Sequence, residues 1–288
     1  MQGNREAGRV QGSAWRLPEM VRLQQHVFIV ADIILVHKPQ RCSVSVHPLQ
    51  HATMAKAKPA QQSTLGKWPI IGAVLIVLYT LGSWLDSNVH KFYAMTPEAL
   101  NAAVQTSLAT SRAAGQEKNA THVVETLLGN LVQTYPDLDL LTDFRNPREW
   151  VFNNAGGAMG AMYIIHASIT EYLIIFGSAV GTEGHTGRHT ADDYFHILTG
   201  QQRCYAAGDL APLVYNPGDV NLMQRGVVRQ YWMEGETWAL EYAAGWIPPM
   251  LPFGLADMLS STLDYISFYH TCRITAREMV KNLLRGKI

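Results

Sequence analysis

Charged side chains are scarce in this sequence. Asp, Glu, Lys and Arg make up 16% of the 288 residues, below the roughly 25% of an average soluble domain. Part of the surface is therefore expected to meet something other than water. The 23 basic and 23 acidic side chains balance to a net charge of zero. The chain thus lacks the clustered excess of Lys and Arg that wholesale nucleic-acid binding requires, and we expect no nucleic-acid partner.

Cysteine is also sparse. Cys42, Cys204 and Cys272 are far apart, form no CxxC pair and leave an odd count. This pattern predicts neither a disulfide framework nor a redox motif, and it offers no cysteine-based metal site. We expect three reduced thiols.

Residues 1–66 lack the patterns of a folded domain. The stretch mixes Gly, Gln, Arg, Ser and Pro with one apolar run at 27–36, which Asp32 interrupts and which is too short to span a bilayer. We expect residues 1–66 to be disordered or to come from a gene-model extension. The segment after Met54 has the character of a more natural cytosolic start.

The next segment holds the longest uncharged run. Pro69–Leu85 contains 17 residues without a charge, and at ~1.5 Å per residue this is near the lower limit for crossing a ~30 Å hydrocarbon core. Trp68 and Trp84 stand at its ends, where amphipathic rings prefer the membrane interface. A secretory signal peptide is the alternative, but the run is long for a signal core and no small-x-small cleavage site follows. We predict a transmembrane anchor over 67–90.

The remainder of the chain changes character twice. Residues 91–148 have a helical pattern, and Thr96-Pro97-Glu98 is typical of a helix start. From 149 to 248, short apolar or alternating runs are separated by Gly, Pro, Asn and Asp, which is typical of an antiparallel sandwich or barrel. Residues 249–288 become helical again. The predicted fold class is α+β.

The last helix carries an apolar stripe beside a basic row. An amphipathic helix on a soluble core would show the same apolar stripe. A basic row beside it, in a chain with a predicted anchor, favours helices that lie on a phospholipid surface. We therefore expect residues 249–288 to be membrane-associated. The basic row consists of Arg273, Arg277, Lys281 and Arg285.

The densest polar cluster is GTEGHTGRHTADDYFHILTG, residues 181–200. Its histidines and carboxylates first suggest a metal. A barrel metal site usually draws alternate residues of one strand, whereas here the spacing is His185-x3-His189, interrupted by Gly187, with no second His-rich strand downstream. We therefore expect no metal and interpret most of the cluster as a solvated loop. A metal-dependent enzyme is kept as an alternative.

A second candidate lies in TWALEYAAGWIP. On a strand, Glu241 shares a face with Ala239 and Ala243, which leave open volume around the acid. Burying an unpaired charge is costly, so such an acid must find a partner or raise its pKa. Both are features of functional acids. The alternative is a strand carboxylate that faces water.

These segments resemble a known family. GTEGHTGRHTADDYF (181–195), WALEYAAGWIP (238–248) and PFGLADMLSSTLDY (252–265) resemble signature segments of fungal sterol C-8 isomerases. EYLIIFG, GTEGHTGR and LEY more distantly resemble the sigma-1 receptor. The resemblance covers about residues 85–288. It implies an N-terminal transmembrane helix, a cupin-like antiparallel β-barrel and two C-terminal membrane-facing helices. A single-pass location in the endoplasmic reticulum membrane and a homo-oligomer, a trimer in the receptor branch, are also implied.

The resemblance further implies a reaction. A sterol isomerase of ergosterol biosynthesis would shift the ring double bond of fecosterol from Δ8 to Δ7, giving episterol, without a cofactor because the shift is redox-neutral. Cationic amphiphilic amines would bind as inhibitors. The alternative is a sigma-1-like membrane receptor or chaperone that binds sterols and amines without catalysis.

Site residues follow from the same resemblance. Glu241 matches the acid that pairs with the amine of receptor ligands, and we expect it to donate the proton. The receptor's second carboxylate matches Phe195, so Asp193 or Asp192 is the expected base, with His185 or His189 assisting. The expected substrate-binding residues are Tyr172, Ile174, Phe176, His189, Ile247, Met250, Leu251 and Gly254.

Overall fold

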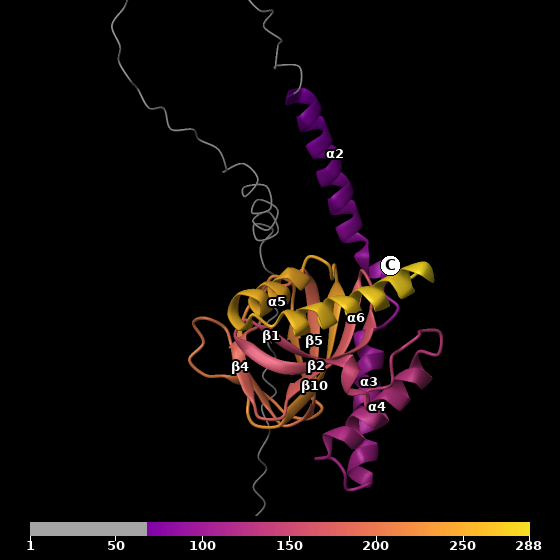
Figure 1. Ribbon diagram of the computed structural model, residues 1–288, viewed down its shortest axis with the longest axis vertical. Coiled ribbons are helices and arrows are strands. Elements are labelled where there is room, and N and C mark those ends of the chain that lie inside the picture. The colour runs from indigo at the N-terminus through magenta and orange to yellow at the C-terminus, as the bar shows by residue number, and fades with distance from the viewer. Residues whose placement is uncertain (1–67) are drawn as a thin grey trace, which may run out of the picture. The chain divides into compact units, whose positions relative to one another are not determined.

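The computed structural model describes residues 68–288 (Figure 1). The expectations for residues 1–66 and for a start near Met54 lie outside the described residues. Within the described part, the order of elements is one apolar helix, two short helices, a run of strands and a helical C-terminus. The fold is α+β with antiparallel sheets, as the sequence predicts.

The predicted anchor forms one helix, α2 (Trp68–Ser87). Its 20 residues give a length of about 30 Å, and by length and composition it is able to cross a membrane. None of its residues is buried, and it projects away from the strands (Figure 1). Its last turn is fastened to the body, because Asp86 Oδ1 accepts hydrogen bonds from Arg225 Nη1 at 2.7 Å and from Trp246 Nε1 at 3.1 Å.

Two helices follow the short 3-10 turn η2 (Val89–Phe92). α3 (Pro97–Ala113) begins as predicted, with the Thr96 hydroxyl accepting a hydrogen bond from Ala99 N, and α4 (Ala120–Thr134) is capped by Asn119 in the same way. The two helices pack on each other and on one face of the large sheet. A second 3-10 turn, η3 (Pro147–Glu149), leads into the first strand.

The strands form two antiparallel sheets. The larger has the order β1-β2-β3-β10-β5-β8, and the smaller has the order β4-β9-β6-β7. The strands are β1 (Trp150–Ala155), β2 (Ala158–Ala167), β3 (Glu171–Ser178), β4 (Thr182–His185), β5 (Ala191–Thr199), β6 (Gln202–Tyr205), β7 (Leu213–Tyr215), β8 (Val220–Met223), β9 (Gln230–Met233) and β10 (Thr237–Gly245).

Both faces of the large sheet are covered at its centre. Leu173 and Tyr242 point to the apolar cluster shared with α3 and α4, while Ile174 and Phe195 point to a second cluster on the opposite face. Burial on both faces explains why the sequence of β3 is a continuous apolar run rather than an alternating one. The second face borders the cavity described below.

The expected solvated loop at 181–200 is largely strand, and this expectation was wrong. β4 takes residues 182–185 and β5 begins at Ala191. Along β5, Asp193 and Phe195 are buried while Asp192 and Tyr194 are only partly so. Two adjacent acids hide this alternation in the sequence, because neither has the hydrophobic character expected of an inward position.

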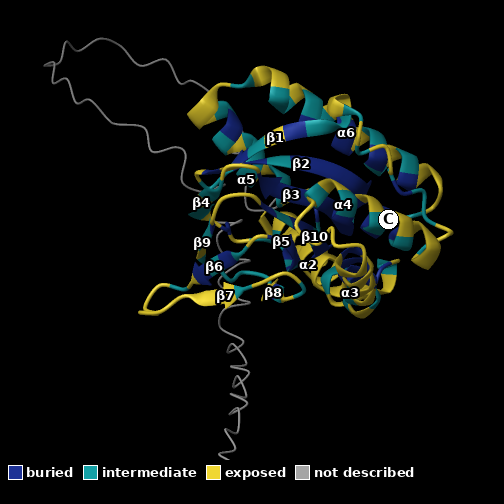
Figure 2. Cartoon of the chain, turned by 90° about the horizontal axis from the view of Figure 1, so that it is seen from below, coloured by how far each residue is buried: buried dark blue, intermediate teal, exposed yellow. Residues whose placement is uncertain are grey.

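The C-terminal part begins with α5 (Leu251–Asp257) and a π-helical turn, η4 (Met258–Thr262). The last helix is α6 (Tyr265–Leu284), capped by Asp264. Figure 2 shows exposed patches along its outer side. The inner side of α6 is mostly polar and consists of Thr271, Ile274, Thr275, Glu278 and Asn282, whereas the exposed large apolar side chains are Tyr265, Ile266, Tyr269, Val280, Leu283 and Leu284.

The basic row of α6 is engaged with the body of the protein. Arg277 pairs with Glu149 at 2.8 Å, and Lys281 pairs with Asp139 at 2.6 Å. Arg285 also reaches Asp139. Three of the four basic residues are thus paired with carboxylates of the protein itself. Contact of this helix with a phospholipid surface stays a prediction.

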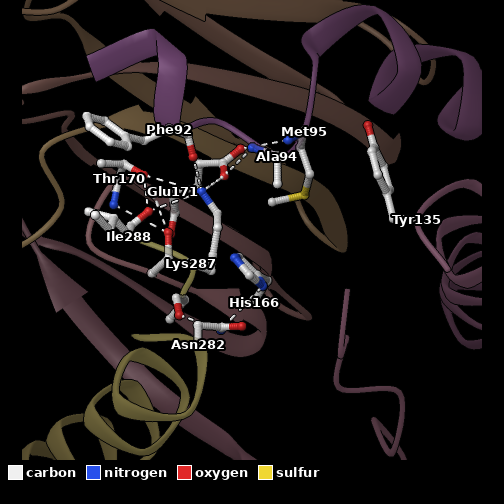
Figure 3. A network of polar contacts seen from close by, with 12 residues as sticks. Phe92, Ala94, Met95, Tyr135, His166, Thr170, Glu171, Asn282, Lys287 and Ile288 are labelled. Atoms are coloured by element: carbon white, nitrogen blue, oxygen red, sulfur yellow. Dashed lines mark hydrogen bonds and ion pairs between the residues drawn. The ribbon is translucent and has the colours of Figure 1, made fainter. Parts of the chain in front are cut away.

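The end of the chain is held by a buried carboxylate (Figure 3). Glu171 is fully buried and forms an ion pair with Lys287 Nζ at 2.6 Å. It also accepts hydrogen bonds from Ala94 N at 2.8 Å, Met95 N at 2.9 Å and Tyr242 Oη at 2.6 Å. This one side chain therefore joins the segment after the anchor, two central strands and the C-terminus.

Candidate active site

A cavity of about 130 Å³ lies between the two sheets and the start of α5. A single water occupies far less volume, so the space suits an organic ligand. Its walls are mainly apolar, with a few polar groups. The principal lining residues are Asn153, Met162, Tyr172, Ile174, Phe176, His185, Thr186, His189, Asp193, Phe195, Gln202, Asn221, Met223, Tyr231, Glu241, Met250, Leu251, Phe253, Gly254 and Thr271.

Glu241 lies at the centre of the large sheet. Strand β10 pairs with β3 and β5, which places Glu241 between Ile174 and Phe195 on the cavity face. Its carboxylate receives no hydrogen bond from residues 68–288, and the accessible part of the side chain borders the cavity. Burial raises the pKa of Glu241 to about 7. The predicted face of this acid is confirmed by the strand register.

Asp193 is the second acid of the cavity. It lies on β5 opposite Ala243, so it is a diagonal neighbour of Glu241, at about 7 Å by ordinary sheet geometry. Asp193 is 4% exposed, and its Oδ1 has no hydrogen-bond partner among the described residues. Burial raises the pKa of Asp193 well above its usual range, and the nearby charges of Glu241 and Asp192 raise it further.

The electrostatics of this pair favour neutral carboxyls. Burial raises the pKa of both acids, and the charges of Glu241 and Asp192 add to the effect at Asp193, which is the less exposed of the two. Loss of one proton from the pair leaves one carboxyl neutral and the other ionised. Two carboxyl groups with one proton can supply an acid and a base in one site.

Asp192 lies away from this pair. Adjacent residues of a strand face opposite sides, and Asp192 Oδ1 accepts a hydrogen bond from Arg225 N at 2.7 Å on the outer side of the sheet. Arg225 in turn pairs with Asp86 at the end of α2. Asp192 therefore does not border the cavity, and its expected role as an alternative base does not agree with its position.

The structure brings together most of the expected substrate-binding residues. Seven of the eight border the cavity; these are Tyr172, Ile174, Phe176, His189, Met250, Leu251 and Gly254. Ile247 is the exception. It is fully buried in the apolar cluster, and its N–H donates to Ile169 O at 3.0 Å. The chain turns after β10, so Ile247 points into the core, and α5 provides the cavity wall.

The smaller sheet contributes residues that sequence reasoning did not identify. Tyr231 on β9 borders the cavity, and burial raises the pKa of its hydroxyl, with the charges of Glu241 and Asp193 adding to the effect. The hydroxyl therefore lies near the acid pair. Gln202 and Asn221 border the same cavity. No local pattern marks these residues, because their approach to Glu241 depends on how the two sheets face each other.

The two histidines of the cavity are oriented by backbone groups. His185 Nδ1 accepts a hydrogen bond from Gly187 N at 2.9 Å, and His189 Nε2 lies 2.6 Å from Thr186 O. Burial lowers the pKa of His189, which favours the neutral ring. Within residues 68–288, no three His, Cys, Asp or Glu side chains are grouped closely enough to hold a metal ion.

Comparison with known proteins places this chain in a family. The family model described as "ERG2 and Sigma1 receptor like protein" matches residues 72–287. The C-8 sterol isomerase erg2 of Aspergillus fumigatus is 47% identical over 245 residues, which cover 85% of this chain and 99% of that protein. The C-8 sterol isomerase of Mycosarcoma maydis is 52% identical over 235 residues, covering 80% of this chain and 95% of that protein.

More distant relatives are also found. The sigma non-opioid intracellular receptor 1 of Gallus gallus is 35% identical over 208 residues, covering 70% of this chain and 85% of that protein. Among solved structures, an RmlC-like cupin from Shewanella frigidimarina matches 38% of this chain and 95% of its own, with a TM-score of 0.30 and 12% identity.

Proposed function

This chain belongs to the ERG2 and Sigma1 receptor like family, and on that premise we propose that it is a C-8 sterol isomerase, which moves the ring double bond of a sterol from Δ8 to Δ7. The observation that carries the proposal is a pair of carboxyls, the buried Asp193 and the partly buried Glu241, in a mainly apolar cavity. Fecosterol is the expected substrate and episterol the product, a step of ergosterol biosynthesis.

The reaction needs one proton delivered and one removed. Asp193 donates its proton to C9, the C8–C9 double bond supplies the electron pair, and a tertiary cation forms at C8. Glu241 then removes a proton from C7, and the C7–H electron pair becomes the C7–C8 double bond. The proton now on Glu241 returns to Asp193, so the pair is regenerated and no redox cofactor takes part.

The surroundings of the pair favour this chemistry. Apolar walls such as Ile174 and Phe195 keep water away from a cation that water would trap. The ionised Glu241 faces the positive charge and stabilises it in a site of low polarity. A ligand with an ammonium group would reproduce the same charge, which explains why cationic amphiphilic amines are expected inhibitors.

A membrane setting suits an insoluble substrate. In the proposal, α2 crosses the endoplasmic reticulum membrane once. The exposed apolar side of α6 then lies against the bilayer. Met250, Leu251 and Gly254 at the start of α5 border the cavity, so a sterol would enter it directly from the lipid. A homo-oligomer, as the resemblance to the receptor branch implies, is part of the same proposal.

Complementation tests the function. A yeast strain that lacks its own isomerase would express the wild-type chain, Glu241→Gln or Asp193→Asn, and its sterols would be measured by gas chromatography and mass spectrometry. We expect ergosterol with the wild type and Δ8 sterols with either variant. Removing a positioned acid or base costs about 10²- to 10⁴-fold in rate.

Glu236→Gln is the matched control, because Glu236 is exposed just before β10 and far from the cavity lining. It should restore ergosterol at an equal protein level. Accumulation of Δ8 sterols with well-expressed wild type would contradict catalysis and favour the receptor alternative.

A further inference from the structure

The part of the cavity wall that comes from β6 and β8 carries a polar network that the proposed reaction does not use. Gln202 on β6 and Asn221 on β8 border the cavity and are 3% and 1% exposed. Asn221 Nδ2 donates to Gln202 Oε1 at 2.8 Å, and Arg229 Nη1 donates to Asn221 Oδ1 at 2.9 Å. Arg229 stands behind the pair, in the segment that leads into β9.

The arginine fixes the direction of every hydrogen bond in this network. A guanidinium has donors only, so the Asn221 atom that faces Arg229 must be its oxygen. Asn221 then presents its NH₂ group to Gln202, and the atom that receives it must be the Gln202 oxygen. The Gln202 NH₂ group is therefore a donor, and none of the hydrogen bonds found among residues 68–288 uses it. Gln202 is only 3% exposed and borders the cavity, so a ligand in the cavity is the partner that this donor can reach.

The network lies at a suitable place relative to the acid pair. Across the large sheet, Glu241 is opposite Phe195, and Phe195 is opposite Asn221. Two strand spacings separate Glu241 from Asn221, or about 9.6 Å. The hydroxyl of a sterol is on ring A and the double bond that moves is in the adjacent ring B. The distance from the hydroxyl across ring A to the double bond, together with one non-bonded contact to the protein at each end, fits this separation of about 9.6 Å.

The α5 segment offers apolar contacts to a ligand in the cavity. Met250, Leu251 and Phe253 line this part of the wall, and they suit the apolar side chain of the substrate. A single hydroxyl is the only polar group of a simple sterol. An amphipathic ligand would therefore enter with the hydroxyl first and leave its tail toward α5.

From these observations we propose that the Gln202 amide donates a hydrogen bond to the oxygen at C3 of the sterol. This contact selects 3-oxygenated sterols and sets the depth at which ring B meets Asp193 and Glu241. Gln202 is a binding and positioning residue, and Asn221 and Arg229 hold its amide in orientation. The inference rests on the proposed sterol isomerase function and names the subsite that orients the substrate.

Equilibrium binding to the purified full-length chain in lipid nanodiscs tests the subsite separately from turnover. The ligands are a Δ8 sterol with the 3-hydroxyl, its 3-ketone and its 3-deoxy analogue. The ketone accepts a hydrogen bond but donates none. We expect the wild type to bind the hydroxyl and ketone forms with similar affinity and the deoxy form about 10-fold to 100-fold more weakly.

Two variants sharpen the test. Gln202→Met keeps an unbranched side chain of similar size and removes the donor; it should weaken binding of the hydroxyl form to the level of the deoxy form and leave the deoxy form unchanged. Gln201→Met is the matched control, because Gln201 bonds Asn216 and Arg203 away from the cavity; it should bind like the wild type.

The outcomes separate the two claims. Equal affinity of the wild type for the hydroxyl and deoxy forms overturns the subsite, as does a ketone that binds as weakly as the deoxy form. The same holds if Gln202→Met weakens both sterols equally. Turnover of the same samples is measured in parallel. Selective binding without any turnover would overturn the isomerase function and leave the subsite standing. Turnover without selective binding of the 3-oxygenated sterols would support the isomerase function and overturn the subsite.

Discussion

The protonation states that the mechanism requires of Glu241 and Asp193 predict how the rate depends on pH, and this dependence tests the mechanism most directly. If Glu241 removes the proton from C7, only its ionised form is active. Burial raises the pKa of Glu241 to about 7, so the acid titrates within the neutral range. In the proposed mechanism Asp193 keeps its proton over this range, and burial and the charges of Glu241 and Asp192 favour that neutral form by raising its pKa.

The magnitude follows from the pKa. With a value of about 7, roughly one Glu241 in eleven is ionised at pH 6, about half at pH 7 and about ten in eleven at pH 8. We expect kcat/KM to rise about fivefold from pH 6 to 7 and about twofold from pH 7 to 8. A fall at higher pH follows when Asp193 loses its proton.

The assay is conversion of a Δ8 sterol by the purified chain in nanodiscs between pH 5.5 and 9, with products separated by gas chromatography. A rate that falls between pH 6 and 8 would refute the reasoning, because the active state would then need a protonated Glu241. Binding of a cationic amine supplies an independent readout. Its affinity should rise through pH 7 in both wild type and Asp193→Asn, since burial and not the Asp193 charge sets the pKa of Glu241.

Two further predictions concern stability. Glu171→Gln leaves the Lys287 ammonium without its counter-ion and should lower the free energy of unfolding by about 3–5 kcal/mol. Adding Lys287→Met should recover part of that loss in thermal denaturation, and a double variant no more stable than Glu171→Gln alone would contradict the coupling. Burial lowers the pKa of His166 to about 4. The fold thus favours the neutral ring, and stability should fall by about 3 kcal/mol as pH drops from 6.5 toward 4. His166→Gln should lose this part of the pH dependence, and an unchanged profile would contradict it.

The sequence predicts the local features of this fold well, and the reason is local chemistry. Thr96 and Pro97 mark a helix start by capping and by a fixed φ angle, which depend on neighbouring residues only. The face of Glu241 follows from the period of a strand. The position of Asp193 relative to Asp192 is harder to predict, because it requires the phase of β5. After Ala191, the next inward position of β5 is an acid rather than an apolar residue.

Features that depend on contacts between residues distant in the sequence could not be predicted from the sequence. Gln202, Asn221 and Tyr231 come from three strands, and the register of two sheets brings them to one cavity. The partners of Arg277 and Lys281 are likewise remote in sequence, so a row of basic residues gave no sign of its ion pairs. The family resemblance predicted the reaction. It identified neither the second acid, Asp193, nor the polar pair Gln202 and Asn221 in the cavity wall.

Two glutamates on adjacent strands, the buried Glu171 and the partly buried Glu241, show how this sheet separates stability from chemistry. Glu171 points to the outer face and is met by two backbone N–H groups, a tyrosine hydroxyl and an ammonium, so its charge is compensated in the folded state. Glu241 points to the inner face, where no described residue donates a hydrogen bond to it. Its charge is therefore costly until a cation occupies the cavity. That unmet charge is what allows Glu241 to accept a proton near neutral pH.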